Sequence, residues 1–462
     1  MSTLKVNKIR DNSGSTDAIV LDPSGGAVLA GVTTVSTVKV GSGVTISSDG
    51  DVFTTGITTS SSVIVGGGVT ISESGIEASG IGITCANING GAVSGRRNMI
   101  INGDQRIAQR GTTAVLMDGS AGYRCVDRMK TDYDGSGGGN WYHAQTGAGT
   151  TISADVPTGQ GFSHSSKITI NTTASQPSGT DHHHQFYTML ERQDVYHLEW
   201  ATSAAKTCTL SFWVKGSITG TYGLWIALYG SSGGSSYYYW TNYTIDSANT
   251  WEKIVITVTG PTSGGAIDST NVLGLRMEWL LGSGSDTETG TLNEWTTSNT
   301  IRTASGTVYL PENSGATWYI TGVQFEVGSQ ATAFEHRSFN EELLLCKRYY
   351  QKSYSYETAP GTADSFLNQL IGRAYATVTN RMELNTRFEV EMRVTPTLTT
   401  YTPSGGTTGD VEDYSSGTGT AAGTARDVAA VRNLGNKGFG GITVSPAQDG
   451  VLGVHYTADA EF

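Results

Sequence analysis

The stretch Thr317-Trp-Tyr-Ile-Thr-Gly-Val-Gln-Phe-Glu-Val327 decides the fold, because its side chains follow the period of two that is typical of a packed β-strand. On a regular strand these residues divide into one face with Trp318, Ile320, Gly322 and Gln324 and an opposite face with Tyr319, Thr321, Val323, Phe325 and Val327. The pattern therefore predicts a packed strand, and we expect this strand to complete a large β-sandwich.

The pattern becomes helical after this strand. Ser338, with Glu341 three residues later, fits a capping box, in which the serine side chain satisfies a backbone N–H at the start of a helix. The residues that follow at helical spacing are Leu343, Leu344, Tyr349 and Tyr350. We therefore expect a connecting helix over residues 338–352, which leads from the sandwich into a separate C-terminal domain.

The composition indicates an all-β protein. The 462 residues include 61 Gly but only 9 Pro, which suits short strands joined by glycine turns, and their 21 Tyr and 9 Trp are too many for a disordered chain. The formal net charge of −12 argues against nucleic acid as a partner, since phosphate binding depends on Lys and Arg. No apolar stretch is long enough for a membrane span, and the N-terminus shows no export signal.

The cysteines form no metal-binding or redox motif. The chain has four, far apart in sequence, at Cys85, Cys125, Cys208 and Cys346. We expect free, buried thiols, as in a protein that is made and assembled in a reducing cytoplasm.

Residues 19–95 are rich in Gly and Val and contain a repeat with a period of 25 residues. Ile19–Thr34 aligns with Val44–Thr59, and a third copy begins at Val69–Gly75. Each copy predicts two or three short strands joined by turns, which is too small a unit to be stable alone. Three arrangements are open: three chains wound into a thin stalk, a single-chain β-solenoid, or a flexible linker. The regular alternation of Val and Ile favours the stalk over a linker.

Positive charges gather just after this repeat in an otherwise acidic chain. They are Arg96, Arg97, Arg106, Arg110, Arg124, Arg128 and Lys130. One interpretation is a contact with an anion or an acidic glycan. The interpretation that we favour is pairing with Asp104, Asp118 and Asp127 across strands or chains.

Two further domains follow the repeat. Residues 96–337 contain many strand patterns separated by loops, and about 200 such residues fit one jelly-roll sandwich. Residues 353–462 contain a second set of strand patterns and predict a C-terminal β-sandwich head. The long Gly- and Ser-rich loops of this head make it a second candidate for receptor contact. Alternatively, it is a knob that sets the register of three chains.

Several motifs, in their order along the chain, resemble those of bacteriophage tail-fibre proteins that contain a carbohydrate-binding-module-like jelly roll. These motifs are Arg97–Gly103, Gln109–Gly111, Asp127-Arg128, Leu210–Gly216, Trp318–Gly328, and Phe334–Ser338 with Glu342–Tyr350. The segments Thr3–Ile9 and Tyr456–Phe462 are similar to the ends of fibre proteins from phages of marine bacteria, including cyanobacteria.

This resemblance implies a homotrimeric virion fibre that is made in the host cytoplasm. Residues 1–18 would attach the fibre to other virion tail proteins. The domains beyond the stalk would bind a host-surface glycan or lipopolysaccharide during adsorption. A fibre fixed to the capsid or collar, without receptor binding, is the alternative.

The aromatic run at residues 237–243 is the best candidate for a glycan site, since sugars present apolar C–H faces and hydroxyls to aromatic rings and amides. The predicted glycan contacts are Tyr237, Tyr238, Tyr239, Trp240, Asn242 and Tyr243, with Trp141 as a weaker candidate. On a strand, Tyr237, Tyr239 and Thr241 face one side, and Tyr238, Trp240 and Asn242 the other. Either one set is exposed, or both sides are covered.

Metal binding and catalysis have weaker support in the sequence. His182 and His184 would form a metal site if three chains brought them together on an axis, whereas a solvated His-rich turn is the interpretation that we favour. No nucleophile elbow, zinc-protease motif or phosphate-binding loop is present. The carboxylates of the repeat fit turns better than a paired acid and base, so a polysaccharide depolymerase is the least favoured function. We predict a fibre that is not an enzyme and needs no cofactor.

Overall fold

The computed structural model divides into two compact units, Met1–Thr84 and Cys85–Phe462. It describes six short strands between residues 8 and 78 and the chain from residue 96 onward, except for residues 114, 118–120, 135–140, 148–154, 179–181, 231–235, 265–266, 286–290, 301–302, 305, 364–365, 376–380, 415–422 and 446–449. Nearly all of the regular structure in these residues is β-strand, which confirms the predicted all-β class.

The first unit contains two separate three-stranded antiparallel sheets. Their strands are β1 (Lys8–Arg10), β2 (Asp17–Leu21), β3 (Ala27–Leu29), β4 (Ser62–Val65), β5 (Val69–Ser72) and β6 (Gly75–Ala78). Short strands therefore occur in the first and third copies of the repeat, while the second copy lies outside the described residues. The winding of three chains into a stalk stays a prediction.

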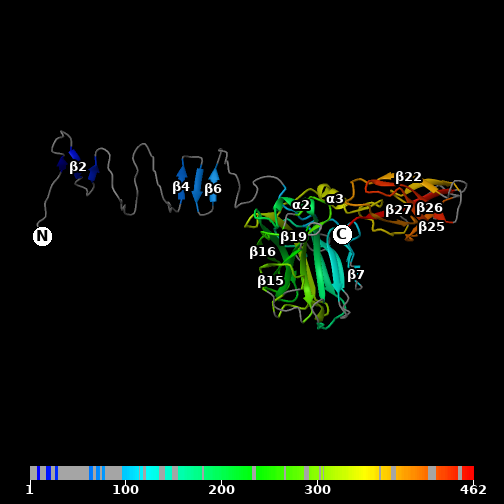
Figure 1. Ribbon diagram of the computed structural model, residues 1–462, viewed down its shortest axis with the longest axis horizontal. Coiled ribbons are helices and arrows are strands. Elements are labelled where there is room, and N and C mark those ends of the chain that lie inside the picture. The colour runs from blue at the N-terminus through cyan, green and yellow to red at the C-terminus, as the bar shows by residue number, and fades with distance from the viewer. Residues whose placement is uncertain are drawn as a thin grey trace. The chain divides into compact units, whose positions relative to one another are not determined.

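The first part of the second unit is a sandwich of two antiparallel sheets (Figure 1, cyan to yellow-green). The six-stranded sheet has the order β16 (Glu252–Thr259), β13 (Thr207–Gly216), β19 (Thr317–Val327), β11 (His164–Ile170), β10 (Trp141–Gly147) and β7 (Val115–Met117). The seven-stranded sheet has the order β18 (Trp295–Thr296), β15 (Tyr237–Ile245), β14 (Gly220–Leu228), β17 (Leu273–Ser283), β12 (His183–Glu191), β9 (Lys130–Asp134) and β8 (Gly122–Tyr123). One large apolar core fills the space between the two sheets.

The predicted strand at 317–327 forms β19, but its two faces exchange part-way along. Trp318 and Ile320 lie in the core as one face of a regular strand would, yet Val323 and Phe325, from the other predicted face, lie there too. The pairing of β19 with β13 shifts by one residue in between, which is a β-bulge. Gly322 sits at the bulge with a φ of +63°, a left-handed conformation that glycine adopts at little cost. The predicted faces are therefore wrong beyond this glycine.

A short helix follows the sandwich, as predicted. In α3 (Phe339–Lys347) the Ser338 side chain accepts a hydrogen bond from the Glu341 N–H at 3.2 Å, which confirms the predicted cap. The helix is shorter than expected, because strand β20 (Tyr350–Lys352) begins within the predicted helical segment.

The C-terminal domain (Figure 1, orange to red) is an eight-stranded antiparallel sheet. Its other strands are β21 (Leu370–Tyr375), β22 (Arg381–Arg387), β23 (Thr397–Tyr401), β24 (Asp410–Asp413), β25 (Thr424–Arg432), β26 (Gly438–Ser445) and β27 (Gly450–Asp459). β24 pairs with both β25 and β27, so the hydrogen-bonded pairs close into a ring around a second apolar core.

The arginines after the repeat pair with carboxylates, as the favoured interpretation predicts. Arg106 Nε lies 3.0 Å from Asp104 Oδ2, and Arg110 Nη1 lies 3.3 Å from Asp127 Oδ1. Burial raises the pKa of Asp127 to about 6, although Arg110 opposes this shift. Asp118 lies outside the described residues.

The last residues of the chain supply partners that the sequence did not predict. Arg128, which is almost fully buried in the sandwich, forms an ion pair with Glu461. The guanidinium of Arg393 lies 4.0 Å from the ring centre of Phe462, and Lys130 Nζ donates to the Phe462 carbonyl at 3.1 Å. The contacts of Arg128 and Lys130 fasten the C-terminal domain to the sandwich, while Arg393 holds Phe462 within the C-terminal domain.

Cys125, Cys208 and Cys346 are buried and form no disulfide within the described residues, which confirms the prediction for these three thiols, and Cys85 lies outside the described residues. Among the described helices, none has the length and apolar character needed to cross a membrane.

Candidate functional site

Strand β15 directs the odd-numbered residues of the aromatic run into the core. Tyr239 and Tyr243 are only 8% and 4% exposed, and half-buried Tyr237 packs against the same core. Tyr243 Oη accepts a hydrogen bond from Trp318 Nε1 at 3.1 Å, and burial raises the pKa of Tyr243 well above its ordinary value. Tyr239 and Tyr243 therefore stabilise the sandwich, and their burial does not favour the predicted contact of these two residues with a glycan.

The even-numbered residues lie on the opposite, outer face of the seven-stranded sheet. There Tyr238 and Trp240 meet Trp225 and Tyr229 of the neighbouring chain segment, and we call these four residues the outer aromatic cluster. The ring of Trp225 stacks on Tyr238 at 5.4 Å between centroids and lies 4.6 Å from Trp240. Leu292, from the segment before β18, packs against the cluster.

A row of polar and aromatic side chains continues from this cluster across the sheet. The guanidinium of Arg276, in β17, lies 5.3 Å from the ring centre of Trp225 and 3.8 Å from that of Tyr187 in β12. Arg276 Nη2 also donates to Gln185 Oε1 at 2.8 Å. The row therefore joins four neighbouring strands, β15, β14, β17 and β12.

Glu278 is the acidic group of this row. Its carboxylate is fully buried, and its Oε2 lies 2.5 Å from Arg276 Nη2. Burial raises the pKa of Glu278 to about 7, although Arg276 and Trp225 stabilise the charged form. The indole N–H of Trp240 is also buried, and it has no acceptor within the part of the chain that the structure describes. An unpaired buried donor of this kind is costly. Because Trp240 is fully buried, this placement does not favour the predicted contact between Trp240 and a glycan.

Asn242 and Trp141, the other predicted glycan contacts, are less favourably placed. In the amide orientation that satisfies both its oxygen and its nitrogen, Asn242 donates a hydrogen bond to the Thr241 carbonyl at 2.9 Å and accepts one from the Ala304 N–H at 3.1 Å. The amide therefore links strand β15 to the segment around Ala304. Trp141 lies in β10, opposite Ile170, and its side chain falls outside what the structure describes.

The histidines proposed as metal ligands are separated by burial. His184 is 2% exposed, and its Nε2 lies 2.9 Å from Tyr309 Oη inside the sandwich. Burial lowers the pKa of His184 to about 3. This placement does not favour His184 as a ligand that meets other chains, whereas His182 is half-buried. The described residues contain no group of three or more His, Cys, Asp or Glu side chains that could hold a metal ion.

Sequence reasoning missed Trp225, Tyr229, Tyr187, Arg276 and Glu278. One signal for the last two was present: two opposite charges, two residues apart, interrupt the apolar run of β17. Charges at that spacing lie on the same face of a strand. The pairing of β14 with β15, which brings Trp225 opposite Trp240, has no such local signal.

No family model and no curated protein matches the chain. Among solved structures, it is similar to the enzymatically active domain of tailspike protein 4 of bacteriophage CBA120, at 12% identity and a TM-score of 0.25, over 50% of this chain and 21% of that one. It is also similar to a family 11 carbohydrate-binding module from Clostridium thermocellum, at 10% identity and a TM-score of 0.22, over 48% and 99% of the two chains. A xylan-binding domain from Paenibacillus barcinonensis matches at 11% identity and a TM-score of 0.22, over 52% and 100%. The chain spans about a fifth of the tailspike structure that it matches.

Proposed function

We propose that this protein binds a neutral glycan on the outer face of its seven-stranded sheet. The observation that carries the proposal is the continuous row of aromatic and polar side chains across four strands, which ends in the outer aromatic cluster. Tyr229 and Tyr238 are half-buried, so part of each ring reaches the surface.

The chemistry of the row suits a sugar. Aromatic rings pack against the C–H faces of pyranose rings, while a few fixed polar groups bind the hydroxyls. Arg276 is half-buried, and its hydrogen bond to buried Gln185 already orients it, which lowers the entropic cost of binding. Trp240 is fully buried beneath Trp225, so it supports the ring of Trp225 and does not itself reach a sugar.

The test is a binding measurement with the full chain against neutral oligosaccharides. Tyr238→Ala should weaken binding about tenfold, since one aromatic contact contributes roughly 0.5–1.5 kcal/mol beyond its buried area. The matched control is Tyr196→Ala, because Tyr196 is 51% exposed and lies outside the row, and its affinity should equal that of the wild type. Equal affinity of Tyr238→Ala and the wild type, or the lack of binding to every neutral oligosaccharide, would overturn the proposal.

We also propose that the chain is a homotrimeric, non-enzymatic phage tail fibre that attaches to host cells. The order of its sequence motifs and the short strands of its repeat support this role. Light scattering should give a mass near 3 × 48.7 kDa for the intact protein. Host cells coated with the full chain should resist infection, and bound oligosaccharide should be recovered uncut. Coated cells that stay fully sensitive would favour a structural fibre without receptor binding.

A further inference from the structure

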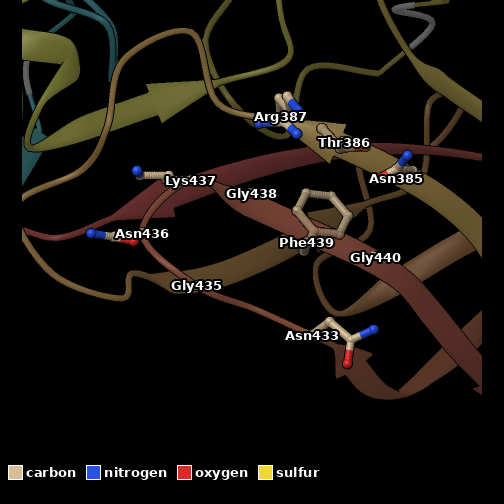
Figure 2. A pocket seen from close by; sticks show the side chains of 10 residues that line it. All are labelled: Asn385, Thr386, Arg387, Asn433, Gly435, Asn436, Lys437, Gly438, Phe439 and Gly440. Atoms are coloured by element: carbon tan, nitrogen blue, oxygen red, sulfur yellow. The ribbon is translucent and has the colours of Figure 1, made fainter.

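A polar pocket of about 370 Å³ opens in the C-terminal domain (Figure 2). None of its lining residues belongs to the outer aromatic cluster. β22, the start of β26 and the turn between β25 and β26 form its walls. The polar side chains that line it are Asn385, Thr386, Arg387, Asn433, Asn436 and Lys437. This volume suits a small organic ligand rather than a single ion.

Two irregularities of the backbone build the pocket. The pairing of β22 with β26 shifts between Glu383 and Thr386, so Asn385 leaves the regular ladder, with a φ of +49°. Asn433, just after β25, has a φ of +50°. Its amide lies over Gly440: a Cβ added at that glycine would come 2.9 Å from Asn433 Nδ2. The absence of a side chain at Gly440 therefore leaves the Asn433 amide where it lines the pocket.

The charge of the pocket is opposite to that of the protein as a whole. Its lining contains two cations, Arg387 and Lys437, and no carboxylate, whereas the chain carries a net charge of −12. Lys437 Nζ lies 3.4 Å from Glu391 Oε2, which partly neutralises it. Arg387 is exposed, and its guanidinium has no ion-pair or hydrogen-bond partner among the residues that the structure describes.

The amides around Arg387 are available as well. The side chains of Asn385 and Asn433 are exposed and make no hydrogen bond within the described part of the chain. Each amide can donate and accept at the same time, as a sugar hydroxyl requires. A bare anion would use only the N–H groups of these amides, whereas a sugar hydroxyl uses their oxygens as well.

We infer that this pocket binds an acidic saccharide whose carboxylate lies against Arg387. The planar guanidinium fork matches a carboxylate with two parallel hydrogen bonds. Asn385 and Asn433 would bind hydroxyls of the same sugar. Phe439 is 3% exposed and forms the floor of the pocket, so recognition is polar and sensitive to salt. This site is separate from the proposed neutral-glycan face.

The probe is an oligosaccharide of uronic acids, titrated into the full chain at low and at high salt. Its neutral, carboxyl-reduced counterpart and a sulfated neutral oligosaccharide of the same length serve as comparisons. The uronic acid oligosaccharide should bind at least tenfold more tightly than the neutral one, and added salt should weaken it. Equal binding of the acidic and neutral probes would overturn the inference. Tighter binding of the sulfated probe would overturn the assignment of a carboxylate.

The variants locate the site. Arg387→Ala should weaken binding of the acidic probe roughly tenfold to a hundredfold, and Arg387→Lys should restore part of it. Gly440→Ala should also weaken it, because the new methyl group displaces Asn433. The matched control is Arg373→Ala, because Arg373 is an exposed arginine of β21 outside the pocket. This variant should bind the acidic probe with the affinity of the wild type.

Tyr238→Ala separates this inference from the proposed function. Because Tyr238 belongs to the sandwich, this variant should lose affinity for neutral oligosaccharides only and keep its affinity for the acidic probe. Undiminished binding of that probe by Arg387→Ala would refute the pocket and leave the neutral-glycan proposal standing. Circular dichroism checks that each variant is folded.

Discussion

We expect Glu191→Ala to loosen the attachment of the C-terminal domain to the sandwich. Glu191 ends strand β12 and is fully buried. Its carboxylate accepts from Arg348 Nε at 2.7 Å and Nη2 at 2.8 Å, and from Tyr349 Oη at 2.6 Å. These hydrogen bonds also raise the pKa of Arg348. Both partners lie where α3 passes into the C-terminal domain.

The size of the loss in unfolding free energy depends on which polar groups the substitution leaves without a partner. The Tyr349 hydroxyl stays buried without its acceptor, while Arg348, whose side chain is 28% exposed, regains part of its hydration. Removing one partner of a buried, hydrogen-bonded ion pair costs about 3–5 kcal/mol. That is a large share of a typical unfolding free energy of about 5–15 kcal/mol.

Urea unfolding can follow this loss of stability in the sandwich and in the whole chain. All 9 tryptophans of the chain lie between residues 141 and 318, so their fluorescence reports on the sandwich, whereas far-UV circular dichroism reports on every strand. Both midpoints should fall in Glu191→Ala. The matched control is Glu383→Ala, since Glu383 pairs with Arg381 on the surface at 2.9 Å and should cost no more than about 0.5 kcal/mol. A Glu191→Ala protein as stable as this control would refute the reasoning.

Two further predictions test the interior of the sandwich. Gly322→Ala should destabilise the protein by about 1–3 kcal/mol more than Gly315→Ala does. Both glycines have a left-handed φ. However, a Cβ at Gly322 would lie 2.5 Å from Phe162 Cζ, whereas a Cβ at Gly315 would meet nothing within 4 Å. Thermal unfolding measures the difference, and equal losses would contradict the steric argument. Burial lowers the pKa values of His143 and His184 to about 3, so only the unfolded chain binds protons at these sites between pH of about 6.5 and about 3. Stability should therefore fall on acidification across that window, by about 1.4 kcal/mol per pH unit for each histidine. In urea titrations at several pH values His184→Gln should show a shallower slope than the wild type, and an unchanged slope would contradict the assignment to His184.

The features that the sequence predicted correctly depend on residues that are close together in the chain. The alternation at 317–327 predicted a strand, and Ser338 with Glu341 predicted the start of a helix, because strand pleating and helix capping are local. The abundance of Gly and aromatic residues also predicted the all-β class, because glycine turns join short strands and the aromatic residues indicate a packed core. The division of the aromatic run into two faces also follows from the alternation of a strand.

Only the tertiary structure decided what covers each face. The bulge at Gly322 exchanges the faces of β19. Strand pairing brings Trp225 beside Tyr238, and Arg276, which is far away in sequence, beside Trp225. Likewise, the carboxylate that neutralises Arg128 comes from Glu461, and the polar pocket needs β22 and β26 side by side. Local periodicity encodes the backbone of a strand, but burial and the partners of charged groups depend on contacts between distant segments, which no short stretch of sequence contains.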